Sequence, residues 1–246
     1  MRTCLSAIVI WIICLGGCGK ETTSPGSNIA SATGKAGSLA RFAIVGDYLY
    51  ALDNTDIVCY DISQGNNPVF KNRIKVNFDI ETIYPYNDKL FIGSQTGMYA
   101  YSLADPANPV QLSVVTHVRS CDPVAVQGNY AYVTLRSGTV CGGSNLMNVY
   151  NVTNLSSPVL VKTINMNSPN GLGINNNALY VTNPAGIKIF NISQPDNPIA
   201  VSDIPEPSAT DVIPYYNTLL VQLSKGTALY DISTPLTPTF ISRINQ

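Results

Sequence analysis

Short apolar runs, separated by Gly, Asn, Asp or Pro, fill the chain from about residue 39 to its end. The clearest group lies between residues 171 and 204. Its four runs cover residues 171–174, 178–182, 186–192 and 199–204, and Asn- and Pro-rich segments divide them. Runs of this length, bounded by turn-forming residues, are typical of short antiparallel β-strands. The pattern therefore predicts four consecutive strands in this stretch.

Three landmarks of this unit recur along the chain. The second run is centred on an apolar residue, and its five copies are 41, 41, 48 and 40 residues apart: Leu49, Leu90, Ala131, Leu179 and Leu219. The third run ends near an aromatic residue: Tyr60, Tyr101, Tyr150, Phe190 and Tyr230. A proline precedes the fourth run each time: Pro68, Pro109, Pro158, Pro198 and Pro238. The chain thus contains five copies of one four-stranded unit.

A period near 40 residues with four strands in each repeat is typical of a β-propeller blade. A single blade cannot cover both of its faces, so neighbouring blades stack around a common axis. The repeat predicts an all-β fold, a β-propeller of about five four-stranded antiparallel blades over residues 39–246. Two forms of closure stay open: blade one packs against blade five, or the blades form an open or partnered array.

Two segments carry the repeat most clearly, Gly128–Thr134 (GNYAYVT) and Gly186–Pro198 (GIKIFNISQPDNP). They resemble the repeat of the LVIVD family of bacterial propeller-like proteins. The resemblance covers about residues 39–246. It implies the propeller fold and says little about activity.

The N-terminus has the features of a secretion signal. Arg2 supplies a positive charge, Leu5–Ile13 is apolar, and Leu15-Gly16-Gly17-Cys18 comes next. The apolar run is shorter than the roughly 20 residues that a membrane span needs. We therefore predict a signal peptide over residues 1–17.

The tetrapeptide that ends at Cys18 resembles the lipobox of bacterial lipoproteins. That resemblance implies a lipidated, palmitate-bearing Cys18 and an anchor in the bacterial cell envelope. Gly19 is not the aspartate that retains many such proteins in the inner membrane, which favours the outer membrane, on its periplasmic or surface face. Residues 18–38 are polar and rich in Gly, Ser and Thr, a composition typical of a flexible tether. The alternative is an ordinary signal peptide with a chance Cys18.

The charge balance argues against a nucleic-acid partner. Removal of Arg2 leaves 13 basic against 15 acidic residues. Three basic residues, Lys71, Arg73 and Lys75, alternate along one outer strand, and a solvated sheet edge explains them. Of the six cysteines, three remain after processing and lipidation. Of these, Cys59 lies inside an apolar strand, where we expect it to pack as a small apolar side chain.

The third repeat contains an insertion. Tyr132 and Tyr150 are 18 residues apart, where the other repeats have ten, so residues 136–145 include eight extra residues. Insertions in repeat proteins commonly fall in loops of one face, often the binding face. By strand topology, Cys121 and Cys141 lie on this same rim. We predict a Cys121–Cys141 disulfide, worth about 3 kcal/mol for a loop of roughly 20 residues; two unrelated thiols are the alternative.

Polar residues also begin the innermost strands on this rim. The equivalent positions are Ala40, Glu81, Asp122, Asn170 and Thr210. We predict that Glu81, Asp122 and Asn170, with Arg136 of the insertion, bind a ligand. Their oxygen atoms suit calcium or a polar, sugar-like molecule. The alternative is that these side chains cap turns and face water in the channel.

Signatures of catalysis are scarce. The chain has a single histidine, His117, and neither a Gly-x-Ser-x-Gly elbow nor a Gly-rich phosphate loop. We assign no catalytic residue, no bound metal and no cofactor, with calcium kept as an option. The favoured function is a membrane-anchored, non-catalytic protein that binds a protein or glycan through the insertion rim. The alternative is a metal-assisted hydrolase or lactonase that uses Glu81 and Asp122.

Overall fold

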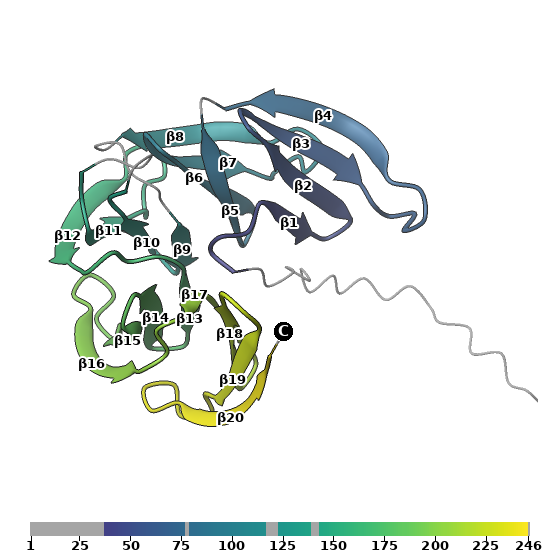
Figure 1. Cartoon of the computed structure of the whole chain (residues 1–246). Coiled ribbons are helices and arrows are strands. Elements are labelled where there is room, and N and C mark those ends of the chain that lie inside the picture. The colour runs from purple at the N-terminus through teal and green to yellow at the C-terminus, as the bar shows by residue number, and fades with distance from the viewer. Residues whose placement is uncertain (1–36, 77–78, 117–122, 139–142, 246) are drawn as a thin grey trace, which may run out of the picture. The chain divides into compact units, whose positions relative to one another are not determined.

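The computed structural model describes residues 37–76, 79–116, 123–138 and 143–245. These residues form five four-stranded antiparallel sheets, each with its strands in chain order. The sheets are the blades of a β-propeller (Figure 1), which confirms the predicted all-β fold. Within the described ranges no helix is long and apolar enough to cross a membrane.

The blades have closely similar strands. Blade one contains β1 (Phe42–Val45), β2 (Tyr48–Asp53), β3 (Asp56–Asp61) and β4 (Val69–Lys75). Blade two contains β5 (Ile80–Tyr86), β6 (Lys89–Ser94), β7 (Gly97–Ser102) and β8 (Val110–Thr116). Blade three contains β9 (Val124–Gln127), β10 (Tyr130–Leu135), β11 (Leu146–Asn151) and β12 (Val159–Asn165). Blade four contains β13 (Leu172–Asn175), β14 (Ala178–Asn183), β15 (Gly186–Asn191) and β16 (Ile199–Ile204). Blade five contains β17 (Ala209–Tyr215), β18 (Thr218–Leu223), β19 (Thr227–Asp231) and β20 (Thr239–Ile244).

The same turn chemistry ends the third strand of every blade. A side-chain oxygen at the strand end accepts a hydrogen bond from the backbone N–H two residues later, as Asp231 does from Ser233 (2.7 Å). This turn redirects the chain toward the outer strand. The equivalent residues in the other blades are Asp61, Ser102, Asn151 and Asn191. In every blade, the residue directly after the repeated aromatic landmark therefore caps a turn.

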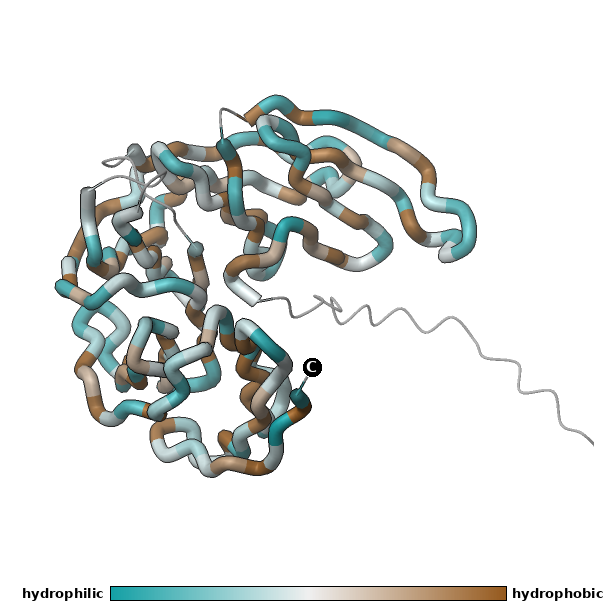
Figure 2. The backbone as a smooth tube through the Cα atoms, in the orientation of Figure 1, coloured by the Kyte–Doolittle hydropathy of each residue, from teal (hydrophilic) through white to brown (hydrophobic). Residues whose placement is uncertain are grey.

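The hydrophobic core is divided among the junctions between blades. Four clusters of buried residues lie mainly between blades one and two, two and three, three and four, and four and five. Along the chain, hydrophobic stretches in the strands alternate with hydrophilic turns (Figure 2). At these four junctions the blades thus bury their faces against one another, as the radial stacking of a propeller requires.

In blades one, three and four, a buried tyrosine of the second strand joins the blade to the next one. The hydroxyl of Tyr50 donates to the carbonyl oxygen of Pro106 (2.7 Å), and that of Tyr132 donates to Pro195 (3.0 Å). Tyr180 makes the same bond to Pro235 (2.6 Å). Because the rings are fully buried, each hydroxyl needs this partner.

We expect the variant Tyr180→Phe to unfold more easily by about 1–2 kcal/mol, because the Pro235 carbonyl loses its donor in a partly buried site. Urea unfolding of the folded domain measures this change. Tyr216→Phe is the matched control, since Tyr216 is 77% exposed. Equal stability of the two variants would contradict a stabilising role for the inter-blade bond.

The segment before β1 is part of the fold. Ser38, within the stretch expected to be a tether, is fully buried. Its hydroxyl accepts from the backbone N–H of Leu172 (2.7 Å) and donates to the carboxylate of Asp211 (3.2 Å). The carbonyl of Ala40 accepts from the N–H of Ile83 (2.9 Å). This short segment therefore links blades two, four and five.

The junction of blades one and five differs from the other four. Leu220 and Leu229 of blade five are only half-buried, whereas Tyr180 and Ile189, at the same positions of blade four, are fully buried. Phe42 of blade one is 57% exposed. Among the described residues, this junction contains a cleft in place of a hydrophobic cluster. We call it the seam (residues 37–44 against 210–222).

Candidate functional site

Two kinds of connection lie together at one end of the propeller. One is the loop between the second and third strands of a blade, and the other leads from the fourth strand of a blade to the first strand of the next. The β2–β3 turn and the start of β5 meet there, because the N–H of Ile80 donates to the carbonyl of Asn54 (3.1 Å). In the next blades, Gln95 N–H bonds the carbonyl of Asp79 (3.2 Å), and Met166 N–H bonds that of Asn145 (3.0 Å). These bonds confirm that both kinds of connection lie on one rim. We call it the insertion rim (residues 54–55, 79–81, 95–96, 136–138, 143–145 and 168–170).

The insertion of blade three lies on this rim. Residues 136–145 connect β10 to β11, whereas only residues 184–185 connect β14 to β15. Hydrogen bonds close the base of the loop: Asn145 Oδ1 accepts from the N–H of Ser137 (3.0 Å), and Asn145 Nδ2 donates to the Ser137 hydroxyl (2.7 Å). The predicted insertion is thus confirmed, and its two ends are held together.

The remaining cysteines fall into two groups. Cys121 and Cys141, together with Asp122, lie outside the described residues, so the predicted disulfide stays a prediction. Cys59 is a free thiol and fully buried, which confirms its packing role. Burial raises the pKa of the Cys59 thiol to about 11, and this leaves little reactive thiolate at neutral pH.

Glu81 stands at an irregular point of the innermost strand of blade two. Ile80 pairs with Ser94 and Thr82 pairs with Gly93, so the register of the β5–β6 ladder shifts at Glu81. Bulges of this kind redirect a side chain and are common near binding sites. The Glu81 carboxylate accepts a hydrogen bond from Gln95 Nε2 (3.2 Å). The bulge therefore places a half-buried acid and an amide together on the insertion rim.

Opposing influences act on the Glu81 carboxyl. Burial raises its pKa above the ordinary value, and the hydrogen bond from Gln95 lowers it. The negative charge of Asp79 raises the pKa further, whereas the guanidinium groups of Arg136 and Arg41 lower it. The net direction is upward, because burial is the largest influence. Two of the sequence-derived site residues, Glu81 and Arg136, thus influence each other electrostatically across the boundary of blades two and three.

Asn170 lies half-buried on the same rim, where the chain enters β13. Its backbone carbonyl accepts from the Thr134 hydroxyl (2.8 Å), and its N–H donates to the carbonyl of Thr182 (2.9 Å). These bonds attach the residue to blades three and four. The structure therefore places Asn170 on the insertion rim and holds it there through its backbone.

The described side chains do not assemble a metal site. In the described part of the chain, no three His, Cys, Asp or Glu side chains lie close enough to hold a metal ion. Asp122, the second predicted acid, is outside that part. Calcium binding therefore stays a prediction, and Glu81 alone supplies no such site.

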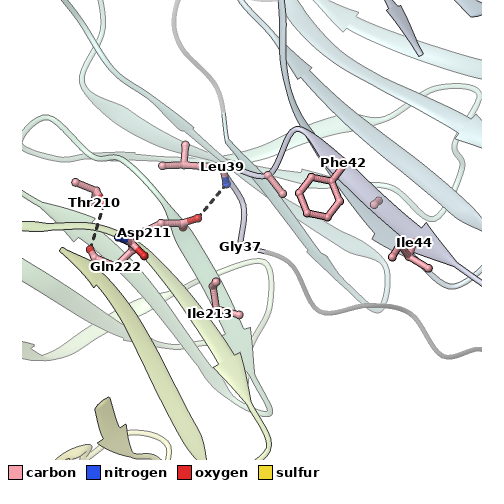
Figure 3. Close-up of a pocket in the computed structure, with 10 residues that line it drawn as sticks. Gly37, Leu39, Phe42, Ile44, Thr210, Asp211, Ile213 and Gln222 are labelled. Carbon is pink, nitrogen blue, oxygen red and sulfur yellow. Dashed lines mark hydrogen bonds between the residues drawn. The ribbon is translucent and has the colours of Figure 1, made fainter. Parts of the chain in front are cut away.

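Sequence reasoning missed a second candidate site, the cleft of the seam. Its volume is about 480 Å³, and Asp211 lies in its wall (Figure 3). The cleft is lined by Gly37, Leu39, Ala40, Phe42, Ala43, Ile44, Thr210, Asp211, Ile213 and Gln222. The β17–β18 ladder skips Thr210, because Ala209 pairs with Leu223 and Asp211 with Gln222. Thr210 therefore lies at a bulge, whereas Asp211 keeps its place in the ladder. No sequence pattern indicates this bulge.

Asp211 is buried and held by four donors, one of which is the backbone N–H of Ser38. Oδ1 accepts from the N–H of Val212 (2.9 Å) and from the Ser38 hydroxyl (3.2 Å). Oδ2 accepts from the N–H of Leu39 (3.2 Å), a bond visible in Figure 3. Burial outweighs these hydrogen bonds and raises the pKa of Asp211 to about 6.

Comparison with known sequences gives no family. No protein-family model matches the chain, and no curated protein matches it either. The resemblance to the LVIVD repeat therefore stays a prediction.

Solved structures show the same fold at low sequence identity. A Lactobacillus plantarum protein is 12% identical with a TM-score of 0.67, over 82% of this chain and 73% of that one. The periplasmic gluconolactonase PpgL of Pseudomonas aeruginosa is 12% identical with a TM-score of 0.64, over 81% and 68%. A functionally unknown protein of Desulfotomaculum acetoxidans is 13% identical with a TM-score of 0.63, over 81% and 68%. These likenesses support the β-propeller class alone.

Proposed function

We propose that the protein is a lipid-anchored, non-catalytic binding protein of the bacterial cell envelope. Its propeller takes a protein or glycan ligand at the insertion rim. One observation carries the proposal: Glu81, Gln95 and Arg136, from blades two and three, interact on this rim beside the ten-residue connection 136–145. A carboxylate, an amide and a guanidinium offer donors and acceptors for sugar hydroxyls or peptide groups.

The position of these groups also favours binding. Glu81 is held by a strand bulge, and Gln95 is buried in the short turn between β6 and β7, so both have fixed directions. Binding sites depend on polar groups that a rigid scaffold orients. Arg136 stands at the first position of the long loop, where its charge acts on the Glu81 carboxyl. A ligand that replaces water around this group gains oriented hydrogen bonds at low entropic cost.

Substitutions on the rim test the proposal. We expect Glu81→Gln/Arg136→Ala to weaken binding to a glycan array or to a cross-linked envelope partner at least tenfold, with an unchanged melting temperature. Arg73→Ala is the matched control, because Arg73 is an exposed arginine of β4 that also pairs with acids, Asp53 and Asp56. Deletion of residues 137–144 should act like the double variant. A partner retained by both rim variants would refute the assignment of this face.

The anchor is tested separately. In cells fed an alkyne analogue of palmitate, we expect the wild-type protein to be labelled and Cys18→Ala to be unlabelled, because Cys18 is the proposed acceptor. Cys59→Ala, which changes a buried thiol, is the control and should keep the label. An unlabelled wild-type protein would contradict the anchor and leave the rim assignment untouched.

A second candidate function, sugar-lactone hydrolysis, rests on Glu81. Its pKa is raised, as a general acid or base requires, and one solved propeller of similar fold is a periplasmic gluconolactonase. In this scheme Asp122 and a divalent metal would complete the site. Lactone hydrolysis that depends on added calcium and is lost in Glu81→Gln would support the enzyme and overturn the non-catalytic proposal.

A further inference from the structure

The seam leaves two blade faces uncovered. On blade five, Leu220 and Leu229 are only half-buried, and on blade one Phe42 is 57% exposed. At the other four junctions, the residues at these positions belong to the hydrophobic clusters between neighbouring blades. Wherever the described part of the chain buries a surface of this kind, another blade covers it.

Hydrogen bonds between hairpin turns tie adjacent blades together at the end opposite the insertion rim. The Tyr86 hydroxyl, just before the β5–β6 turn, accepts from the N–H of Gly128 (2.7 Å). Gly128 is the left-handed residue of the β9–β10 turn. In the next blade pair, Gln127 Nε2 donates to the carbonyl of Asn176 (2.8 Å), the left-handed residue of the β13–β14 turn. The residue before one turn thus bonds the left-handed residue of the next turn.

Both halves of this contact exist at the seam, but they are apart. Tyr215 has the position of Tyr86, since each pairs with the first residue of the next strand across a two-residue turn. Gly46 has the position of Gly128, and their φ angles are 56° and 57°. Tyr215 is nevertheless 52% exposed, and a cleft lies between the two blades. The face that matches blade five is therefore that of blade one.

We propose that blade five of one copy packs against blade one of a second copy, head to tail. The Tyr215 hydroxyl then accepts from the N–H of Gly46 of the second copy, as Tyr86 does from Gly128 within the chain. Leu220 and Leu229 lose their exposed area against the second copy's apolar face. This interface is separate from the insertion rim and does not depend on the proposed function.

The molecule's own blade one does not occupy this place in the structure. Gly37 and Leu39, from the segment that enters the fold, line the cleft between blades one and five. The solved propellers of similar fold contain more chain, because this protein covers only 68% to 73% of their length. That difference is consistent with an arc that five blades leave open. Because the contact is heterologous, each end of a pair keeps one uncovered face, and further copies can add.

Sedimentation velocity of the processed protein tests the proposal. We expect the average mass of the wild type to rise with concentration, whereas Phe42→Glu and Tyr215→Glu should each remain monomeric. Both side chains are exposed, so both variants should keep the melting temperature. An equal mixture of the two variants should form dimers, because one keeps blade five intact and the other keeps blade one intact. Val110→Glu, which changes a 61% exposed residue of β8, is the control and should associate like the wild type. A monomeric wild type, or a mixture that stays monomeric, would overturn the interface.

Cross-linking with a short bismaleimide distinguishes a second copy from closure of the ring on itself. Asp47 and Asn217 are exposed residues beside the two halves of the contact. A mixture of Asp47→Cys and Asn217→Cys should give a cross-linked dimer above the background of the wild type. The matched mixture of Asp88→Cys and Asn129→Cys should not, because the junction of blades two and three is already filled. A link within one chain of the double variant Asp47→Cys/Asn217→Cys, with no link between copies, would show that blade one closes the ring and would overturn the proposal.

Discussion

Replacing Arg243 with alanine should lower the free energy of unfolding by about 1–3 kcal/mol, because it removes the charged partner of a buried carboxylate. Glu206, in the connection from β16 to β17, is 2% exposed. Its Oε2 accepts from Arg243 (2.6 Å) and from the Tyr230 hydroxyl (2.9 Å). Without the guanidinium, this carboxylate is buried with a single neutral donor. Urea unfolding at pH 7 measures the loss.

A double-mutant cycle separates charge from packing. Glu206→Gln removes the charge but keeps the shape, so Arg243→Ala/Glu206→Gln should be more stable than Arg243→Ala alone. Arg73→Ala is the control for losing an exposed arginine, and we expect it to cost less than about 1 kcal/mol. If the double variant is no more stable than Arg243→Ala, the buried charge is not the reason for the loss.

The strands and blades could be predicted because their determinants are local. A side chain such as Asp231 caps the turn two residues later, and Pro238 precedes the outer strand at a fixed distance. The alternation of apolar residues specifies which face of a strand is buried. Five copies of these signals reinforce one another, so the number of blades and the position of the insertion could be obtained by counting residues.

The candidate site was predictable only in part. Counting from the second strand placed Glu81 and Asn170 on one rim, and the structure agrees. In blade five the same count selected Thr210, whereas the buried acid is the next residue, Asp211. The bulge at Thr210 depends on how β17 pairs with β18, which sequence spacing does not reveal.

Two further features of the seam depend on distant contacts. Ser38 looks like a tether residue in composition, yet it bonds Leu172 and Asp211, residues more than 130 positions away. Phe42 looks like an ordinary core residue of an inner strand, yet it is exposed at the seam. Whether blade five covers blade one is decided by the geometry of all the junctions together, and no local pattern records it.

The stability of the protein should decrease as the pH rises from about 4 to about 6.5, and Asp211 should cause about 3 kcal/mol of the decrease. Its pKa is about 6 in the folded state, against 3.8 as the ordinary value. Between these values the folded state holds the proton and the unfolded state does not. The folded state therefore binds more protons in this window, and raising the pH favours unfolding.

Urea unfolding of wild type and Asp211→Asn at several pH values between 4 and 7 tests this expectation. The difference between them isolates Asp211 from Glu81, whose raised pKa acts in the same direction. Asp211→Asn loses the acceptor for the Leu39 N–H, and this loss lowers the stability equally at every pH. The slope of its stability against pH should be shallower than that of the wild type. The residues that bond the Asp211 carboxylate are Ser38, Leu39 and Val212, and none of them ionises in this pH range. A pH dependence that disappears in Asp211→Asn can therefore be assigned to Asp211 itself. A slope of stability against pH that Asp211→Asn leaves unchanged would show that Asp211 is not the titrating group.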